Sequence, residues 1–231
     1  MFTIFYQFKF PAGKVLKYAF AIDEREVILQ RESVQPAPAW VKLTEKQCPH
    51  CPLDPIKHRN CPIAENIAHL IEDHDLSVSH DEIEIQVTTP ERVISTATSV
   101  QRGLSSMIGL LIATSTCPYT HFLKPMVRFH LPFANEEETE FRFLSTFLIA
   151  QYFQDKHSTS SFDMNALVAV YENLQVVNKH IADRIRDVTD SDAAVNAVII
   201  LDMLAKSLPY SLEEQFEELK VSFQPYLAGL K

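Results

Sequence analysis

Glycine is scarce in this 231-residue chain, which contains only four. Loops that cradle phosphate groups need several closely spaced glycines, and neither a Walker motif nor a dinucleotide-binding fingerprint is present. Long apolar runs are missing too. The longest, between Met107 and Ala113, is far shorter than the roughly 20 residues of a membrane-spanning helix. The two absences argue against the common nucleotide-binding folds and against a transmembrane segment.

Basic residues are in the minority, with 21 Lys and Arg against 30 Asp and Glu and a formal net charge of −9. An excess of negative charge repels the phosphate backbone of nucleic acids and the headgroups of anionic membranes. We therefore expect neither nucleic acid nor a membrane as a partner. A protein partner and the oligomeric state are left open.

The amino-terminal segment is apolar, but it lacks the basic start, the continuous apolar middle and the small-residue cleavage site of a signal peptide. We therefore expect a cytoplasmic protein. In that reducing compartment, cysteines stay free, bind metal or take part in redox chemistry rather than forming structural disulfides.

Apolar residues make up 46% of the chain, and at its start they follow the pattern of strands. They alternate from Phe2 to Phe10 and again from Leu16 to Ile22, on either side of a turn at residues 11–14. A period of two with aromatic enrichment predicts a β-hairpin, and residues 27–29 predict a third antiparallel strand. The result is a small β-meander.

The next segments alternate between helical and extended patterns. Pro62 opens a predicted amphipathic helix, and alternation over residues 83–87 predicts another strand with one polar face. Thr89 and Pro90 have the residue types of an N-cap and a first helical position. We therefore expect a long helix from there to about Ser115.

The last hundred residues are predicted to be helical. Asn135 with Glu138, and Ser211 with Glu214, have the spacing of capping boxes, and two further helical patterns lie between them. Asn178 lies within one of these apolar patterns, where a buried carboxamide is expected to find a polar partner and to fix helix register.

These elements predict an α+β fold in which a small N-terminal antiparallel β-meander and a cysteine-rich loop pack with a mainly helical C-terminal half. We divide the chain into an α+β half, residues 1–132, and a helical half, residues 133–231. The halves are expected to share one core because no flexible linker separates them.

Every one of the four cysteines is followed by proline, at Cys48, Cys51, Cys61 and Cys117. With 13 prolines in the chain, chance alone would give this on the order of once in a hundred thousand. Proline holds the preceding residue in an extended conformation and is favoured at the start of a helix. Because three cysteines share one loop and the fourth follows a predicted helix, we expect all four to bind one metal centre.

The identity of the metal is less constrained than its ligands. Zinc ribbons usually have two C-x2-C pairs in which the residue after the second cysteine donates its N–H to sulfur, and Pro52 lacks that N–H. Clustered cysteines with one remote Cys-Pro are similar to the ligand layout of many [4Fe-4S] proteins. We therefore favour a [4Fe-4S] cluster slightly over zinc.

Other interpretations of the cysteine loop remain open. His50, His58 or His121 could replace one thiolate, and the thiols could simply be reduced and partly buried. The tetrapeptide at residues 48–51 resembles the active site of periplasmic thioredoxin-fold oxidoreductases. That family places a helix immediately after the motif, and Pro52 and Pro55 forbid one here.

A second group of polar residues lies after the fourth cysteine. Lys124, Arg128 and His130 could form a basic patch for an anionic ligand or for the carboxylate of a partner. His121 and His130 precede an acidic run at residues 136–140, which we assign to the first turns of a helix because the helix dipole stabilises negative charge there.

Several stretches resemble an uncharacterised bacterial family known only as a domain of unknown function. They run from Trp40 through the cysteine loop, from Ala113 to Pro132, and on to residues 151–153. The resemblance spans most of the chain and implies one cooperating unit. It implies no activity.

The sequence therefore predicts a non-catalytic, cytoplasmic, metal-binding protein, regulatory or adaptor-like, with no catalytic residues assigned. Two alternatives are kept: a redox enzyme or electron carrier that uses the same cysteine centre, and a helical protein-interaction module with incidental thiols. Whether the chain is an enzyme is left open.

Overall fold

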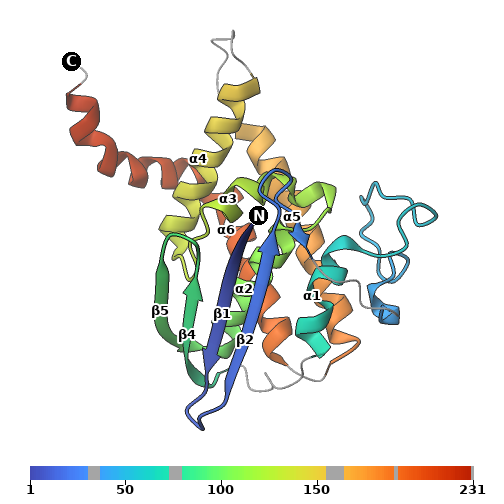
Figure 1. Ribbon diagram of the computed structural model, residues 1–231. Coiled ribbons are helices and arrows are strands. Elements are labelled where there is room, and N and C mark those ends of the chain that lie inside the picture. The colour runs from blue at the N-terminus through green and yellow to red at the C-terminus, as the bar shows by residue number, and fades with distance from the viewer. Residues whose placement is uncertain (31–36, 73–79, 155–163, 190–191, 230–231) are drawn as a thin grey trace.

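The computed structural model describes residues 1–30, 37–72, 80–154, 164–189 and 192–229, and its fold is α+β. Figure 1 shows the sheet as a single layer, with helix α2 (Val100–Ala113) running behind it and the other helices beyond. Within the described ranges, no helix combines the length and the apolarity that crossing a bilayer requires.

The sheet is antiparallel and has the strand order β3-β2-β1-β4-β5. Alternation along the first strand is confirmed, because Ile4, Tyr6 and Phe8 are buried while Phe5 between them is exposed. The predicted third strand is a short one that pairs with the end of the second. The strands are β1 (Phe2–Lys9), β2 (Val15–Ile22), β3 (Leu29–Gln30), β4 (Glu82–Thr88) and β5 (Val93–Ser99).

The predicted helix start at Thr89 is wrong, because the segment that follows it is strand β5. Thr89 instead closes the turn between β4 and β5: its backbone N–H donates to Arg92 O (2.9 Å), and its hydroxyl accepts from the N–H of Arg92 (3.2 Å). β5 then pairs with β4 along its whole length. The β-branched residues Val93, Ile94, Thr96 and Thr98 favour this pairing, and α2 begins only at Val100.

Helix α1 (Pro62–Glu72) begins at the predicted proline. The described residues that follow it form α2 and five further helical segments, of which η2 and α3 are short and adjacent. They are η2 (Pro118–Leu123), α3 (Lys124–Arg128), α4 (Glu136–Gln154), α5 (Met164–Arg186) and α6 (Asp192–Ala228); the short turn η1 (Ala39–Val41) precedes the cysteine loop.

One of the two predicted capping boxes is present. The Asn135 side chain accepts from the N–H of Glu138 (2.8 Å), and the Glu138 carboxylate accepts from the N–H of Asn135 (2.9 Å), at the start of α4. The second prediction is wrong, because Ser211 lies inside α6 and begins no helix. The preceding turns of α6 already supply acceptors for the backbone N–H groups there, so no cap is needed. Figure 1 shows the last part of α6 projecting away from the rest of the molecule.

In the described residues, the largest apolar cluster joins the sheet to five helices, α1, α2, α3, α5 and α6. Its buried members include Ile4, Ile67, Leu104, Ile181 and Val198. A smaller cluster packs α4 and α5 against α6. The domain boundary at residue 132 stays a prediction.

Candidate functional site

The four cysteines lie in two connections that flank helices. Cys61 directly precedes the first residue of α1, as predicted, and Cys117 directly precedes the first residue of η2, so two Cys-Pro pairs open helical segments. Cys48 and Cys51 lie in the loop before α1, where the N–H of Cys51 donates to Cys48 O (2.9 Å). All four thiols are free, and Cys117 is the most buried.

Specific contacts bring these connections together. The N–H of Cys61 donates to Val41 O (2.8 Å), which closes the base of the loop. The Tyr119 hydroxyl donates to His50 O (2.7 Å), and the centroids of the Tyr119 and His50 rings are 4.1 Å apart. Tyr119 follows Cys117 by two residues and His50 lies between Cys48 and Cys51. These contacts therefore join the remote Cys-Pro pair to the loop.

The thiols influence one another electrostatically. Burial raises the pKa of Cys48 to about 12, and repulsion from the thiolates of Cys61, Cys117 and Cys51 adds to this shift. Burial likewise raises the pKa of Cys117 to about 12, again with contributions from Cys61 and Cys51. In the absence of a metal, Cys48 and Cys117 are therefore protonated at neutral pH.

The thiols do not form a metal-ligand group in the described structure. Among the residues that the structure describes, no three or more His, Cys, Asp or Glu side chains are placed so that they could hold one metal ion. Coordination by Cys48, Cys51, Cys61 and Cys117 would therefore require a different arrangement of these side chains. Their assignment as ligands stays a prediction.

A buried arginine lies beside this loop, and sequence analysis missed it. Arg184 of α5 is 2% exposed, and its guanidinium donates to three carbonyl oxygens of the segment that leads into the loop: Trp40 (2.6 Å), Lys42 (2.9 Å) and Leu43 (3.2 Å). No carboxylate of the described chain pairs with it. Its positive charge lowers the pKa of Cys48, against the stronger effect of burial. The one signal in the sequence was a basic residue between apolar positions of a helix.

The alternative ligands differ in their surroundings. His50 packs against Tyr119, and burial lowers its pKa, so its imidazole is neutral at pH 7. His58 and His121 are exposed. No helix follows Cys51 in the described loop, as the prolines predicted, so the context of a thioredoxin-type active site is missing.

The three basic residues after the fourth cysteine make separate contacts. The Lys124 ammonium donates to Glu26 O, Arg128 pairs with the Glu91 carboxylate (2.8 Å), and His130 Nε2 lies 2.6 Å from the Tyr6 hydroxyl. Burial lowers the pKa of His130 to about 3, so its ring is neutral. The three side chains are therefore not gathered around one anion site.

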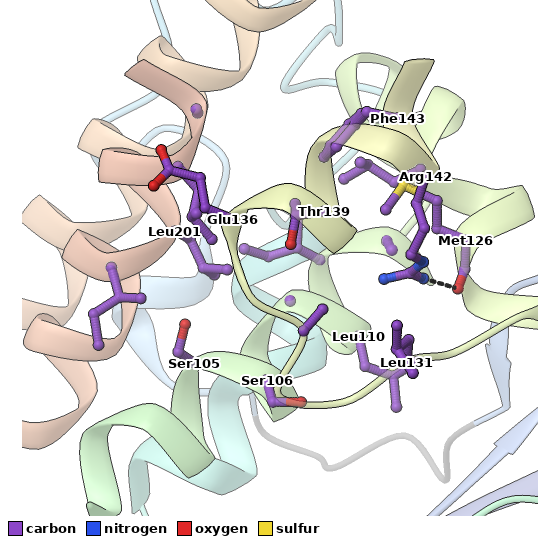
Figure 2. Close-up of a pocket in the computed structure, with 18 of the residues that line it drawn as sticks. Ser105, Ser106, Leu110, Met126, Leu131, Glu136, Thr139, Arg142, Phe143 and Leu201 are labelled. Atoms are coloured by element: carbon purple, nitrogen blue, oxygen red, sulfur yellow. Dashed lines mark hydrogen bonds between the residues drawn. The ribbon is translucent and has the colours of Figure 1, made fainter. Parts of the chain in front are cut away.

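A separate cavity of about 550 Å³ lies between α2, α4, α5 and α6 (Figure 2). Most of its lining is apolar, and the close-up shows Leu110 from α2, Phe143 from α4 and Leu201 from α6 around it. The Arg142 guanidinium reaches across one end, where Nη2 donates to Met126 O (3.0 Å). Sequence analysis missed this cavity because its lining comes from segments that lie far apart in the chain, from Arg102 to Ser207.

Comparison with known families provides one match, to a family described as "Domain of unknown function (DUF6901)", over residues 4–224. The chain belongs to this family. The match confirms the predicted resemblance to an uncharacterised family over most of the chain. It includes the four cysteines and every residue that lines the cavity, and the family description assigns an activity to neither. No curated protein and no solved structure matches the chain.

Proposed function

We propose that the chain is a metal-binding protein of the cytoplasm, regulatory or adaptor-like rather than catalytic. In this proposal Cys48, Cys51, Cys61 and Cys117 hold one [4Fe-4S] cluster or one zinc ion, and the cluster is favoured. The observation that carries it is the contact of Tyr119 with His50, which brings the connection of Cys117 to the loop of the other three cysteines.

The environment of Arg184 supports a negatively charged centre at this place. A buried guanidinium without a carboxylate partner is costly unless another negative charge lies near it. In a zinc centre with four thiolates, four negative charges exceed the two positive charges of the ion, so the centre as a whole is an anion. Such an anion would compensate the charge of Arg184, which already favours the thiolate form of Cys48.

Pro52 bears on the choice of metal. In a zinc knuckle, an N–H after the second cysteine hydrogen-bonds the ligand sulfur, and proline removes that donor. A cubane cluster accepts thiolates from irregular connections such as these. This difference favours the cluster over zinc.

The test is elemental and spectroscopic analysis of the full chain purified without oxygen. A brown protein with iron and sulfide in equal amounts and absorption near roughly 400 nm supports the cluster; a colourless protein with one zinc per chain supports the zinc form. Replacement of Cys117 by Ser should lower metal content at least severalfold, whereas Lys57→Ala, at an exposed position of the cysteine loop, should leave it unchanged.

Two results would contradict the proposal. Protein that is free of metal and takes up neither iron and sulfide nor zinc on reconstitution has no such centre. Equal metal content and equal thermal stability in wild type and Cys117→Ser would instead support an interaction module with incidental thiols. If a cluster is found, bleaching by dithionite that air reverses would favour an electron carrier over a static centre.

A further inference from the structure

The cavity between α2, α4, α5 and α6 has a buried floor and an exposed mouth. Arg102, Glu136 and Met203 line it and are exposed, so they mark the mouth. Tyr171 and Asn178 of α5 line it and are almost completely buried, at 0% and 1% exposure. A volume of about 550 Å³ with mostly apolar walls falls in the range of small-molecule sites.

The floor carries polar atoms that have no partner within the described chain. Neither Nδ2 nor Oδ1 of Asn178 makes a hydrogen bond, and neither does the hydroxyl of Tyr171. Sequence analysis expected Asn178 to be satisfied by another part of the protein, and the structure differs on this point. Buried polar groups are nearly always hydrogen-bonded, so an unpartnered carboxamide on a cavity wall points to a group that binds in the cavity.

The two sides of the Asn178 carboxamide define what that group must be. One side donates and the adjacent side accepts, so a carboxamide on the ligand would satisfy both at once, and a carbonyl would satisfy the donor. A hydrocarbon end placed against Asn178 would leave both atoms unpaired. We propose that the cavity binds an amphipathic small molecule with an apolar body, whose neutral carbonyl or carboxamide group points inward to Asn178.

The charges around the cavity agree with a neutral inner group. The charged side chains that line it are Arg102 from α2 and Glu136 and Arg142 from α4, whereas the described side chains of α5 and α6 contribute none. Arg142 already donates to the carbonyl oxygens of Met126 and Phe129 (3.0 and 3.2 Å). No cation therefore lines the α5 wall where Asn178 lies, and a carboxylate bound there would lack a counter-charge.

The experiment uses prodan, a neutral naphthalene ketone whose emission shifts to the blue in apolar sites, with the full-length protein. Two competitors differ only in the group of interest: 4-butylbenzamide and butylbenzene. We expect saturable prodan binding, and displacement by the amide at concentrations about tenfold or more below those of the hydrocarbon, the difference that one buried hydrogen bond makes. Absence of a saturable site, or equal displacement by both competitors, would overturn the proposal.

Variants of two asparagines on α5 assign the preference to one residue. Asn178→Leu should keep prodan binding but abolish the preference for the amide, and its urea midpoint should not fall below that of wild type, because an unpaired polar group is removed. Asn173→Leu is the matched control: that side chain donates to Ala169 O (2.8 Å), does not line the cavity, and should leave the preference intact. Amide preference that persists in Asn178→Leu, or in Asn178→Ala if the leucine variant does not fold, would overturn the proposal.

Discussion

Arg184 and Asn178 lie two turns apart on α5 and are both almost completely buried, yet their polar atoms differ in their surroundings. Arg184 donates to three carbonyl oxygens and holds the start of the cysteine loop against the helix. Asn178 has no partner in the described chain and faces the cavity. Because removing a satisfied buried group costs stability and removing an unsatisfied one does not, substitutions at these positions should differ in the sign of their effect.

The first prediction concerns Arg184. Arg184→Met should lower the free energy of unfolding by about 2–4 kcal/mol, because charged hydrogen bonds to three carbonyl oxygens are lost together. Arg186→Met is the matched control two residues further along α5: Arg186 pairs with Asp183 (2.6 Å), and its side chain is 48% exposed. That exposed pair is worth less than about 1 kcal/mol. Urea unfolding of the two variants checks the difference; equal losses would show that Arg184 does not anchor the loop.

At the scale of elements, α2 lies between the sheet and the cavity and contacts both. One side of the helix packs on the sheet at Gly103, where an added Cβ would lie 2.0 Å from Ile85 Cδ1 and 2.9 Å from Phe8 Cε1. Gly109, nearly two turns later, lines the cavity, and a Cβ there would meet Leu201 Cδ2 at 3.5 Å, an ordinary contact. The first glycine is required by close packing and the second is not.

The same substitution at these two glycines should therefore have opposite effects. Gly103→Ala should destabilise the protein by about 1–3 kcal/mol, because Ile85 and Phe8 are buried and cannot move aside freely. Gly109→Ala should stabilise it by up to about 1 kcal/mol, because alanine is the better helix former and its methyl group fits. Thermal unfolding of both variants measures this. A loss at both positions would mean that α2 is packed as tightly against α6 as against the sheet.

Elements could be predicted from the sequence where one local rule acted alone. The alternation of Phe2 to Phe10 and the capping box at Asn135 needed no information from distant residues, and both are present. Thr89 and Ser211 carried equally good local signals for helix starts, and both predictions are wrong. At Thr89 the pairing of β5 with β4 overrides the signal, and at Ser211 a helix that began at Asp192 is already in progress. In both cases the capping signal was outweighed by the element in which, or next to which, the residue lies.

At the scale of the whole molecule, the sequence predicted that the cysteine-containing segments lie near one another, but not what surrounds them. The Cys-Pro pairs indicated that distant segments meet, and Tyr119 and His50 join those segments in the structure. Arg184 and the cavity could not be predicted, because each depends on contacts between residues separated by a hundred positions or more. From the raised pKa values of Cys48 and Cys117 we expect the stability of the molecule to depend on pH, and from the proposed function we expect it to depend on metal.

This sensitivity supplies the last prediction. The pKa values of Cys48 and Cys117 are raised to about 12 from an ordinary value of 9.0, mainly by burial. A raised pKa contributes stability that is fully present below the unfolded value and is lost as pH rises toward the folded one, so metal-free protein should lose stability from about pH 9 upward. The tyrosines with raised pKa values add to this loss only from about pH 10, where unperturbed tyrosine ionises.

Urea unfolding between pH 8 and pH 10, with chelator and reductant present, should show the decline, and Cys117→Ser should show a smaller one. Metal-loaded protein, whose thiols are already deprotonated, should show none over this interval. A decline that is the same with and without metal would mean that the metal does not bind through these thiols.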